Sequence, residues 1–184
     1  MKRAVLGKKS PSIMTMPDPG RDHFQGDIDA PMTLLEYGDY ECPYCGEVFA
    51  VVKAIQRRLG QRLCFAYRNF PLNHLHPHAK HAAEAAEAAG AQGRFWEMHE
   101  ILFENQAALD DQDLARYAAS LGLDPDQLLR EVRAGLYAER VREDFRHGAR
   151  AGVNGTPTFF INGTPYDGST SLEPLLAAIE DTED

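Results

Sequence analysis

Residues 33–45, which read TLLEYGDYECPYC, decide the fold. Residues 33–37 form an apolar run typical of a strand, and an amphipathic helical pattern starts at Pro43. Cys42 and Cys45 lie three residues apart at this strand–helix junction. Cα atoms at positions i and i+3 of a helix are about 5 Å apart, within the range of roughly 4.4–6.8 Å that a disulfide requires. The two thiols are therefore expected to form and break a disulfide without movement of the backbone.

The position of Cys42 favours its thiolate. Cys42 is the expected N-cap, and Pro43 is the expected first helical residue, where a missing N–H costs nothing. Unpaired backbone N–H groups and the positive end of the helix dipole then point at the Cys42 sulfur. Thiolates are the reactive form of cysteine. Cys45, one turn further, is expected to be more enclosed and to act as the resolving thiol, while Asp39 and Glu41 should raise the pKa of Cys42 and oppose the helix.

The number of cysteines helps to distinguish a redox pair from other roles of the two thiols. A C-x-x-C motif beside a strand–helix pattern indicates a redox pair, and the alternatives are a structural disulfide or half of a zinc site. A zinc site usually needs a second ligand pair, whereas the only other cysteine, Cys64, is expected to be a buried apolar filler. No metal is therefore expected. The histidines that could form an alternative metal cluster, or simply lie partly exposed at a helix start, are His74, His76, His78 and His81.

Composition narrows the class of protein. The chain has 184 residues, 43% of them hydrophobic and 26% charged, as expected for one globular domain. A net charge of −9 argues against nucleic acid and anionic membranes as partners, and no run approaches the ~20 apolar residues of a membrane span. The apolar run 4–6 is far shorter than the roughly 7–15 residues of a signal-peptide core. The expected location is cytoplasmic for the chain as given, or periplasmic if a leader has been removed.

The order of elements predicts an α/β fold. Residues 1–24 are rich in proline and lack periodicity, which predicts a flexible N-terminal arm before one domain at 25–184. Strands at 33–37 and 62–70 flank a helix at 43–59, a β-α-β unit with a parallel pair. Residues from 77 to about 151 are helical in pattern. A strand at 158–161, a hairpin turn, a short edge strand and a closing helix complete a β-α-β, helical block, β-β-α order.

Several motifs together resemble the thioredoxin fold, and the helical block narrows the resemblance to the DsbA-like thiol-disulfide oxidoreductases of bacteria. These motifs are CPYC at 42–45, RNFPL at 68–72, HP at 76–77 and GTPTFF at 155–160. The resemblance implies a central mixed sheet. It also implies a thioredoxin core at 25–72 and 152–184 that is interrupted by a helical insertion at 73–151.

The resemblance also implies roles for particular residues. It implies a cis peptide bond at Thr156-Pro157, in a loop that lies beside the dithiol. The backbone of this loop pairs with an extended substrate like an added strand, and Pro43 and Tyr44 are expected to contact the same substrate.

Glu36 is implied to be a buried acid that takes a proton from Cys45 during exchange. The plainer alternative is that Glu36 faces solvent at the end of its strand.

One position departs from the family pattern. DsbA-type oxidases typically carry histidine before the second cysteine, where this chain has Tyr44, and CPYC is typical of glutaredoxins. The expected activity is thiol-disulfide exchange with protein dithiols and disulfides, with no cofactor beyond the Cys42–Cys45 couple. The alternatives are a glutathione-linked reductase, with glutathione as co-substrate, and a redox-sensing or metal-binding adaptor. A thioredoxin-type reductant is a further expected partner.

Overall fold

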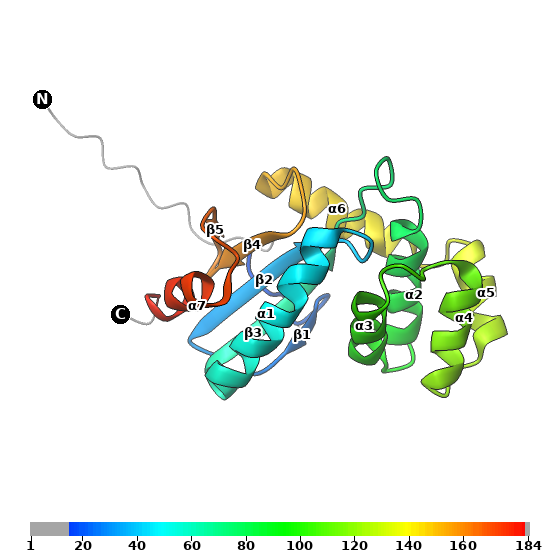
Figure 1. Ribbon diagram of the computed structural model, residues 1–184, viewed down its shortest axis with the longest axis horizontal. Helices are drawn as coiled ribbons and strands as arrows, with labels where there is room; N and C mark the ends of the chain where they lie inside the picture. The colour runs from blue at the N-terminus through cyan, green and yellow to red at the C-terminus, as the bar shows by residue number, and fades with distance from the viewer. Residues whose placement is uncertain (1–14, 183–184) are drawn as a thin grey trace, which may run out of the picture.

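A mixed five-stranded sheet forms the centre of the molecule (Figure 1), for which a computed structural model describes residues 15–182. The strands are β1 (His23–Gln25), β2 (Met32–Gly38), β3 (Leu63–Asn69), β4 (Thr158–Ile161) and β5 (Thr164–Tyr166). They lie in the order β1-β3-β2-β4-β5, with β2 and β3 parallel and the other neighbours antiparallel. The expected mixed sheet, the parallel pair and the edge position of β5 are confirmed.

Two helices cover one face of the sheet and a third covers the other. α1 (Pro43–Leu59) packs beside α7 (Leu172–Glu180), and it is amphipathic as expected, with Val48, Val52, Ile55 and Leu59 in its buried stripe. α6 (Ala138–Ala151) packs against β3, over a second apolar cluster that includes Leu35 and Phe160. Successive residues of the central strands point to opposite faces, so both faces of β2 are buried.

The helical block lies beside the sheet, on the right of Figure 1. Its other members are α2 (Ala79–Gly90), α3 (Phe95–Glu104), α4 (Asp111–Ser120) and α5 (Pro125–Arg133). α2 contacts α3, α4, α5 and α6, and its alanines are buried. Small side chains let four helices approach one central helix. α2 begins two residues after the expected Pro77, and His78 occupies its N-cap position.

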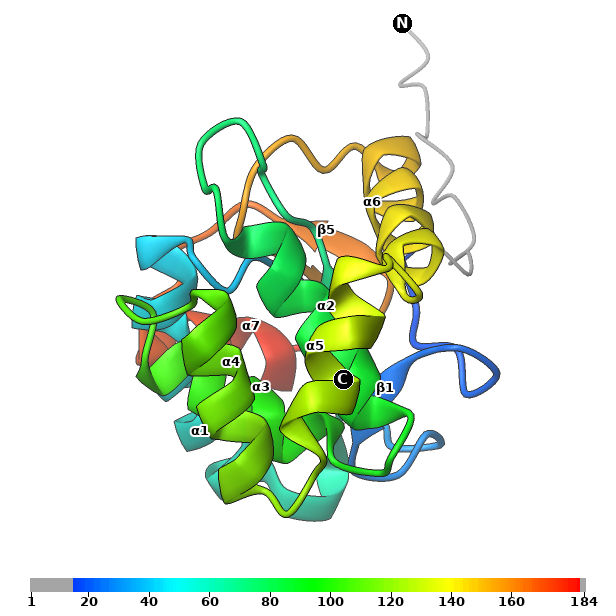
Figure 2. The ribbon, with the colours of Figure 1, turned by 90° about the vertical axis from the view of Figure 1, so that its right-hand side faces the viewer.

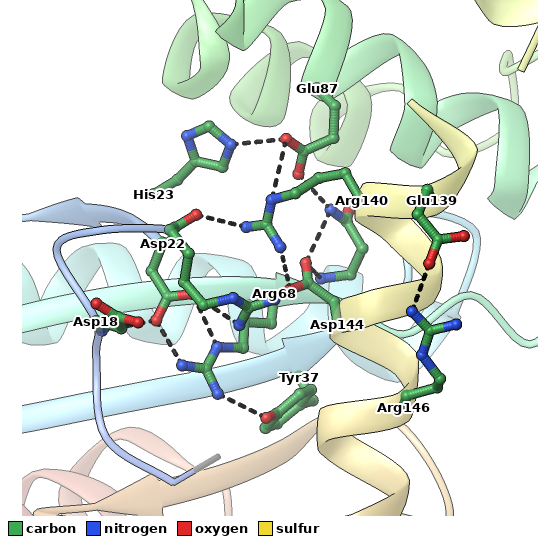
Figure 3. Close-up of polar contacts among 12 residues, drawn as sticks. Asp18, Asp22, His23, Tyr37, Arg68, Glu87, Glu139, Arg140, Asp144 and Arg146 are labelled. Atoms are coloured by element: carbon green, nitrogen blue, oxygen red, sulfur yellow. Dashed lines mark hydrogen bonds and ion pairs between the residues drawn. The ribbon is translucent and has the colours of Figure 1, made fainter. Parts of the chain in front are cut away.

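Residues 22–24, which were expected to belong to a flexible arm, pack against the sheet, while residues 1–14 lie outside the described part of the chain. β1 pairs with β3, and Asp22 is only 8% exposed. The Asp22 carboxylate accepts hydrogen bonds from Nε and an Nη of fully buried Arg68, at 2.9 and 2.5 Å. Figure 3 shows this pair next to Arg140 and Asp144 of α6. A buried guanidinium needs a carboxylate partner, and that need fixes the segment against the sheet.

Candidate active site

The dithiol lies at the start of α1. Cys42 is the N-cap with extended backbone (φ −74°, ψ 121°), and Pro43 is the first helical residue, as expected. Both cysteines are free thiols and buried, with Cys42 4% and Cys45 0% exposed. The Cys42 N–H donates to the Asp39 carbonyl at 3.1 Å, which fixes the turn between β2 and the helix.

The surroundings of Cys42 stabilise its thiolate. They lower its pKa to about 5 from an ordinary value of 9.0. The largest cause is a hydrogen bond from the Cys45 thiol, followed by the Thr156 side chain and the backbone N–H groups of Cys45 and Tyr44, while burial acts in the opposite direction. The Thr156 hydroxyl is buried and has no other hydrogen-bond partner among the described residues, so it is available to donate to the Cys42 thiolate. The pKa of Cys42 is therefore lowered, although Asp39 and Glu41 were expected to raise it, and neither acid is among the main causes of the shift.

Cys45 and Glu36 lie deeper and hold their protons. Burial, the hydrogen bond to Cys42 and the charges of Glu36 and Cys42 raise the pKa of Cys45 far above its ordinary range. Burial, and secondarily the Cys42 charge, raise the pKa of Glu36 to about 8. Glu36 is 3% exposed, and its Oε1 has no hydrogen-bond partner among the described residues. The solvent-facing alternative for Glu36 is therefore wrong.

The loop before β4 meets the dithiol. The Thr156-Pro157 peptide bond is cis, as the family resemblance implied. The Cys42 thiol donates to the Thr156 carbonyl at 3.4 Å over a separation of 114 residues. Pro43 is exposed and Tyr44 is 66% exposed, so the dithiol is flanked by an accessible surface. The structure thus brings together all the expected site residues of the helix start and the loop.

The acids and histidines around the site form pairs. Asp39 accepts from the Leu72 N–H and contacts His76 Nδ1, both at 2.8 Å. Glu41 makes the same kind of contact with His78 Nδ1 at 2.8 Å. His81 contacts a different carboxylate, so the four histidines do not converge, and residues 15–182 contain no group of three potential metal ligands. The paired carboxylates instead hold the loop before α2 against the turn before Cys42.

Gln106 is a site residue that the sequence analysis missed. It follows α3, and its Nε2 donates to the carbonyls of Tyr40 and Cys42 at 2.9 and 2.8 Å. A Cβ at Gly46 would lie 2.0 Å from the Gln106 Oε1, so any larger residue there would push the Gln106 side chain out of this position. Glycine in the first turns of a helix was the available signal, because it lowers helix stability and usually marks a close approach.

Cys64 lies where it was expected, and Trp96 belongs to the apolar core. Cys64 is fully buried within β3, which suits an apolar filler. Trp96 packs on Phe65 and Phe95, with ring centroids at 5.7 and 5.1 Å, as part of the helical core.

Comparison with known proteins identifies the family. The family model described as thioredoxin matches residues 18–181. The structure of oxidised BdbD from Bacillus subtilis has a TM-score of 0.82 at 25% identity, covering 95% of this chain and 96% of that one. A thioredoxin-like oxidoreductase from Silicibacter pomeroyi DSS-3 has a TM-score of 0.80 at 27% identity, covering 92% and 95%.

Curated relatives carry a different name. "Na(+)/H(+) antiporter NhaA 1" of Mycobacterium sp. (strain KMS) is 43% identical over 165 residues, which are 89% of this chain and 27% of the relative. The chain thus spans about a quarter of the length of the curated relatives that it matches.

Among residues 15–182, no helix is long and apolar enough to cross a membrane. By its family model, fold and C-x-x-C motif, the chain belongs to the thioredoxin family.

Proposed function

We propose that the chain exchanges disulfides with protein substrates by cycling Cys42 and Cys45 between dithiol and disulfide. One observation carries the proposal: a helix-start thiol with its pKa lowered to about 5 lies one turn from a buried second thiol. A low-pKa nucleophile beside a resolving thiol is the arrangement that exchange through a mixed disulfide requires.

The cycle balances as a two-electron transfer. The Cys42 thiolate attacks one sulfur of a substrate disulfide, the substrate S–S bond breaks, and the other substrate sulfur leaves as a thiolate that takes a proton. Cys45 loses its proton and attacks the Cys42 sulfur, which releases the second substrate sulfur and forms the Cys42–Cys45 disulfide. The substrate is reduced and the protein oxidised; the reverse sequence oxidises a substrate dithiol.

Glu36 is proposed to accept the proton from Cys45. The pKa of Cys45 is raised too far for spontaneous ionisation near neutral pH, so its attack needs a base. The charge of Glu36 is among the causes that raise the pKa of Cys45, which supports a proton transfer between the two groups. With its own pKa at about 8, Glu36 can both accept and release a proton near pH 7.

The substrate chain is proposed to lie along the Thr156-Pro157 loop. The Thr156 carbonyl already faces Cys42, and it is the backbone group that an extended peptide would pair with. Pro43 and Tyr44 offer the exposed surface on the other side of the sulfur.

Thiolate stabilisation indicates the direction of exchange. It lowers the free energy of the dithiol form alone, which makes the Cys42–Cys45 disulfide a stronger oxidant. We therefore propose disulfide donation in an oxidising compartment, outside the cytoplasm. This corresponds to the second of the two locations expected from the sequence, the periplasm.

Two single-thiol variants test the mechanism. Cys42→Ser should lose exchange with a disulfide-containing peptide, because the attacking thiolate is gone. Cys45→Ser should accumulate a mixed disulfide of substrate and Cys42, visible by mass without reductant. Full turnover by Cys42→Ser would contradict the proposal.

A glutathione-linked activity is the second candidate, favoured by Tyr44 in the CPYC motif. It needs one thiol only, because glutathione can resolve the mixed disulfide. Catalytic turnover of Cys45→Ser with glutathione would therefore favour this candidate over exchange with proteins.

A further inference from the structure

A pocket of about 500 Å³ lies away from the dithiol, between the loop after β3 and helices α2 and α6. Figures 1 and 2 both show that loop arching beside α6 at the end of the molecule where α1 begins. The volume lies within the range of roughly 300–1,000 Å³ that is typical of ligand pockets. No step of the proposed exchange reaction uses it.

The pocket has an apolar wall that is held in place. Leu72, Val141 and Phe145 contribute to it. Phe145 is 38% exposed, and its ring stacks on Phe70 with centroids 4.2 Å apart. A large aromatic side chain left exposed in a fixed orientation offers an apolar contact that a partner can bury.

The rim of the pocket is cationic. It carries the cations Lys80 and Arg142 and the imidazole of His74, and no aspartate or glutamate of the described residues lines the pocket, although the chain has 28 acids against 19 basic residues. Lys80 lies 3.6 Å from Glu84, beyond a good hydrogen bond, and is half exposed. Arg142 contacts Glu139 through Nε and one Nη, which leaves its other Nη for a ligand.

The surface around the pocket suits a macromolecule better than a small ligand. Leu75 and Leu136 are each 62% exposed. Leu75 follows His74 directly, and Leu136 precedes pocket residue Ala138 by two positions. A small ligand in the pocket would leave both leucines in water, whereas a protein would cover them.

The pocket is also linked to the dithiol. Its Leu72 donates its backbone N–H to the Asp39 carboxylate at 2.8 Å, and the Asp39 carbonyl accepts from the Cys42 N–H at 3.1 Å. One residue thus fixes both the pocket wall and the turn that carries the nucleophile.

We propose that this pocket docks a segment of an exchange-partner protein, with a large apolar side chain in the pocket and an adjacent carboxylate on the rim. That the docked protein is an exchange partner rests on the proposed function. The docking itself does not depend on it.

The test uses two peptides and two variants. Acetyl-Gly-Ser-Phe-Glu-Gly-Ser-amide and the same peptide with Lys in place of Glu are titrated into isotope-labelled protein, and amide shifts are followed by NMR. Arg142→Glu reverses the rim charge. Arg150→Glu is the matched control, because it makes the same change on an exposed residue of the same helix outside the pocket. Unchanged spectra of the free variants establish folding.

The wild type should bind the Glu peptide at least about threefold more tightly than the Lys peptide, the size of a surface ion pair. The shifts should centre on the pocket. Arg142→Glu should reverse this preference and Arg150→Glu should keep it. Equal preference in all three proteins, or shifts centred elsewhere, would overturn the proposal. Decanoate that binds more tightly than either peptide would also overturn it, in favour of a small amphiphile. No disulfide exchange occurs in this test, so the binding result can be interpreted even if the chain proves to have no exchange activity.

Discussion

Replacement of the buried acid Glu36 by glutamine should change how stability depends on pH. The pKa of Glu36 is about 8 in the folded protein, against 4.5 for the free side chain, chiefly because burial disfavours its charged form. Between these values the folded state keeps a proton that the unfolded state has released. Stability must therefore fall as pH rises across this window.

The magnitude follows from the width of the window. Each unit of pKa difference corresponds to about 1.4 kcal/mol, so the 3.5 units between 4.5 and 8 amount to about 5 kcal/mol. At pH 7 about 3 kcal/mol of this is already lost. The Glu36→Gln variant has no group to ionise at this position, and its advantage over the wild type should grow by about that amount from pH 4.5 to pH 7.

The assay is urea unfolding of both proteins under reducing conditions at several pH values from 4.5 to 8.5. The difference between the two curves cancels the titrations of groups that do not interact with Glu36, which the two proteins share. Glu47→Gln is the control, because Glu47 is exposed at the start of the same helix as the dithiol. Parallel curves for wild type and Glu36→Gln would refute the idea that Glu36 is a buried acid with a raised pKa.

Three further predictions concern the site and its support. Thiolate absorbance near 240 nm should titrate with a midpoint near pH 5 for Cys42, and Cys45→Ala should move it upward by removing the largest stabilising hydrogen bond. Asp22→Asn should lower the free energy of unfolding by about 3 kcal/mol or more, because Arg68 stays buried without its carboxylate. Gly38→Ala should cost about 1–3 kcal/mol, because its Cβ would lie 2.5 Å from a buried tyrosine ring.

Matched control variants distinguish these specific effects from a general loss of stability. Gly155→Ala should be near neutral, since nothing lies within 4 Å of a Cβ there. Asp126→Asn, on the exposed start of α5, should also leave stability almost unchanged. If Asp22→Asn resembles Asp126→Asn, or Gly38→Ala resembles Gly155→Ala, the packing argument fails. A Cys42 midpoint near its ordinary value of 9.0 would contradict the thiolate argument.

Local patterns in the sequence predicted most of the fold. The stripe from Val48 to Leu59 has the 3.6-residue period of a helix, and both central strands are long apolar runs, so hydrophobic periodicity identified them. β1 has only three residues, His23–Gln25, which is too short for any period to show. Its place in the sheet depends on pairing with β3 and on the Asp22–Arg68 contact across 46 residues.

The candidate site shows the same contrast between features that local sequence patterns predict and contacts that join distant segments. The dithiol and its N-cap geometry follow from four consecutive residues, so they could be read directly. The role of Gln106 could not be predicted from the sequence, because its hydrogen bonds to the turn before α1 join segments 64 and 66 residues apart. The pairing of Asp39 with His76 is likewise a tertiary contact, and the sequence suggested an effect of this acid on Cys42 without showing that a histidine engages it.

Equilibration in glutathione buffers of graded redox ratio, followed by alkylation and counting of free thiols by mass, tests the central claim most directly. The account predicts one reversible transition that involves Cys42 and Cys45 together and leaves Cys64 unchanged. Thioredoxin, with a thiol pKa near 7, has a potential of about −270 mV. A Cys42 pKa of about 5 stabilises the dithiol further at pH 7 and should place the midpoint on the order of 50 mV higher, near −220 mV. The absence of a two-thiol transition would contradict the account and favour the metal-binding adaptor.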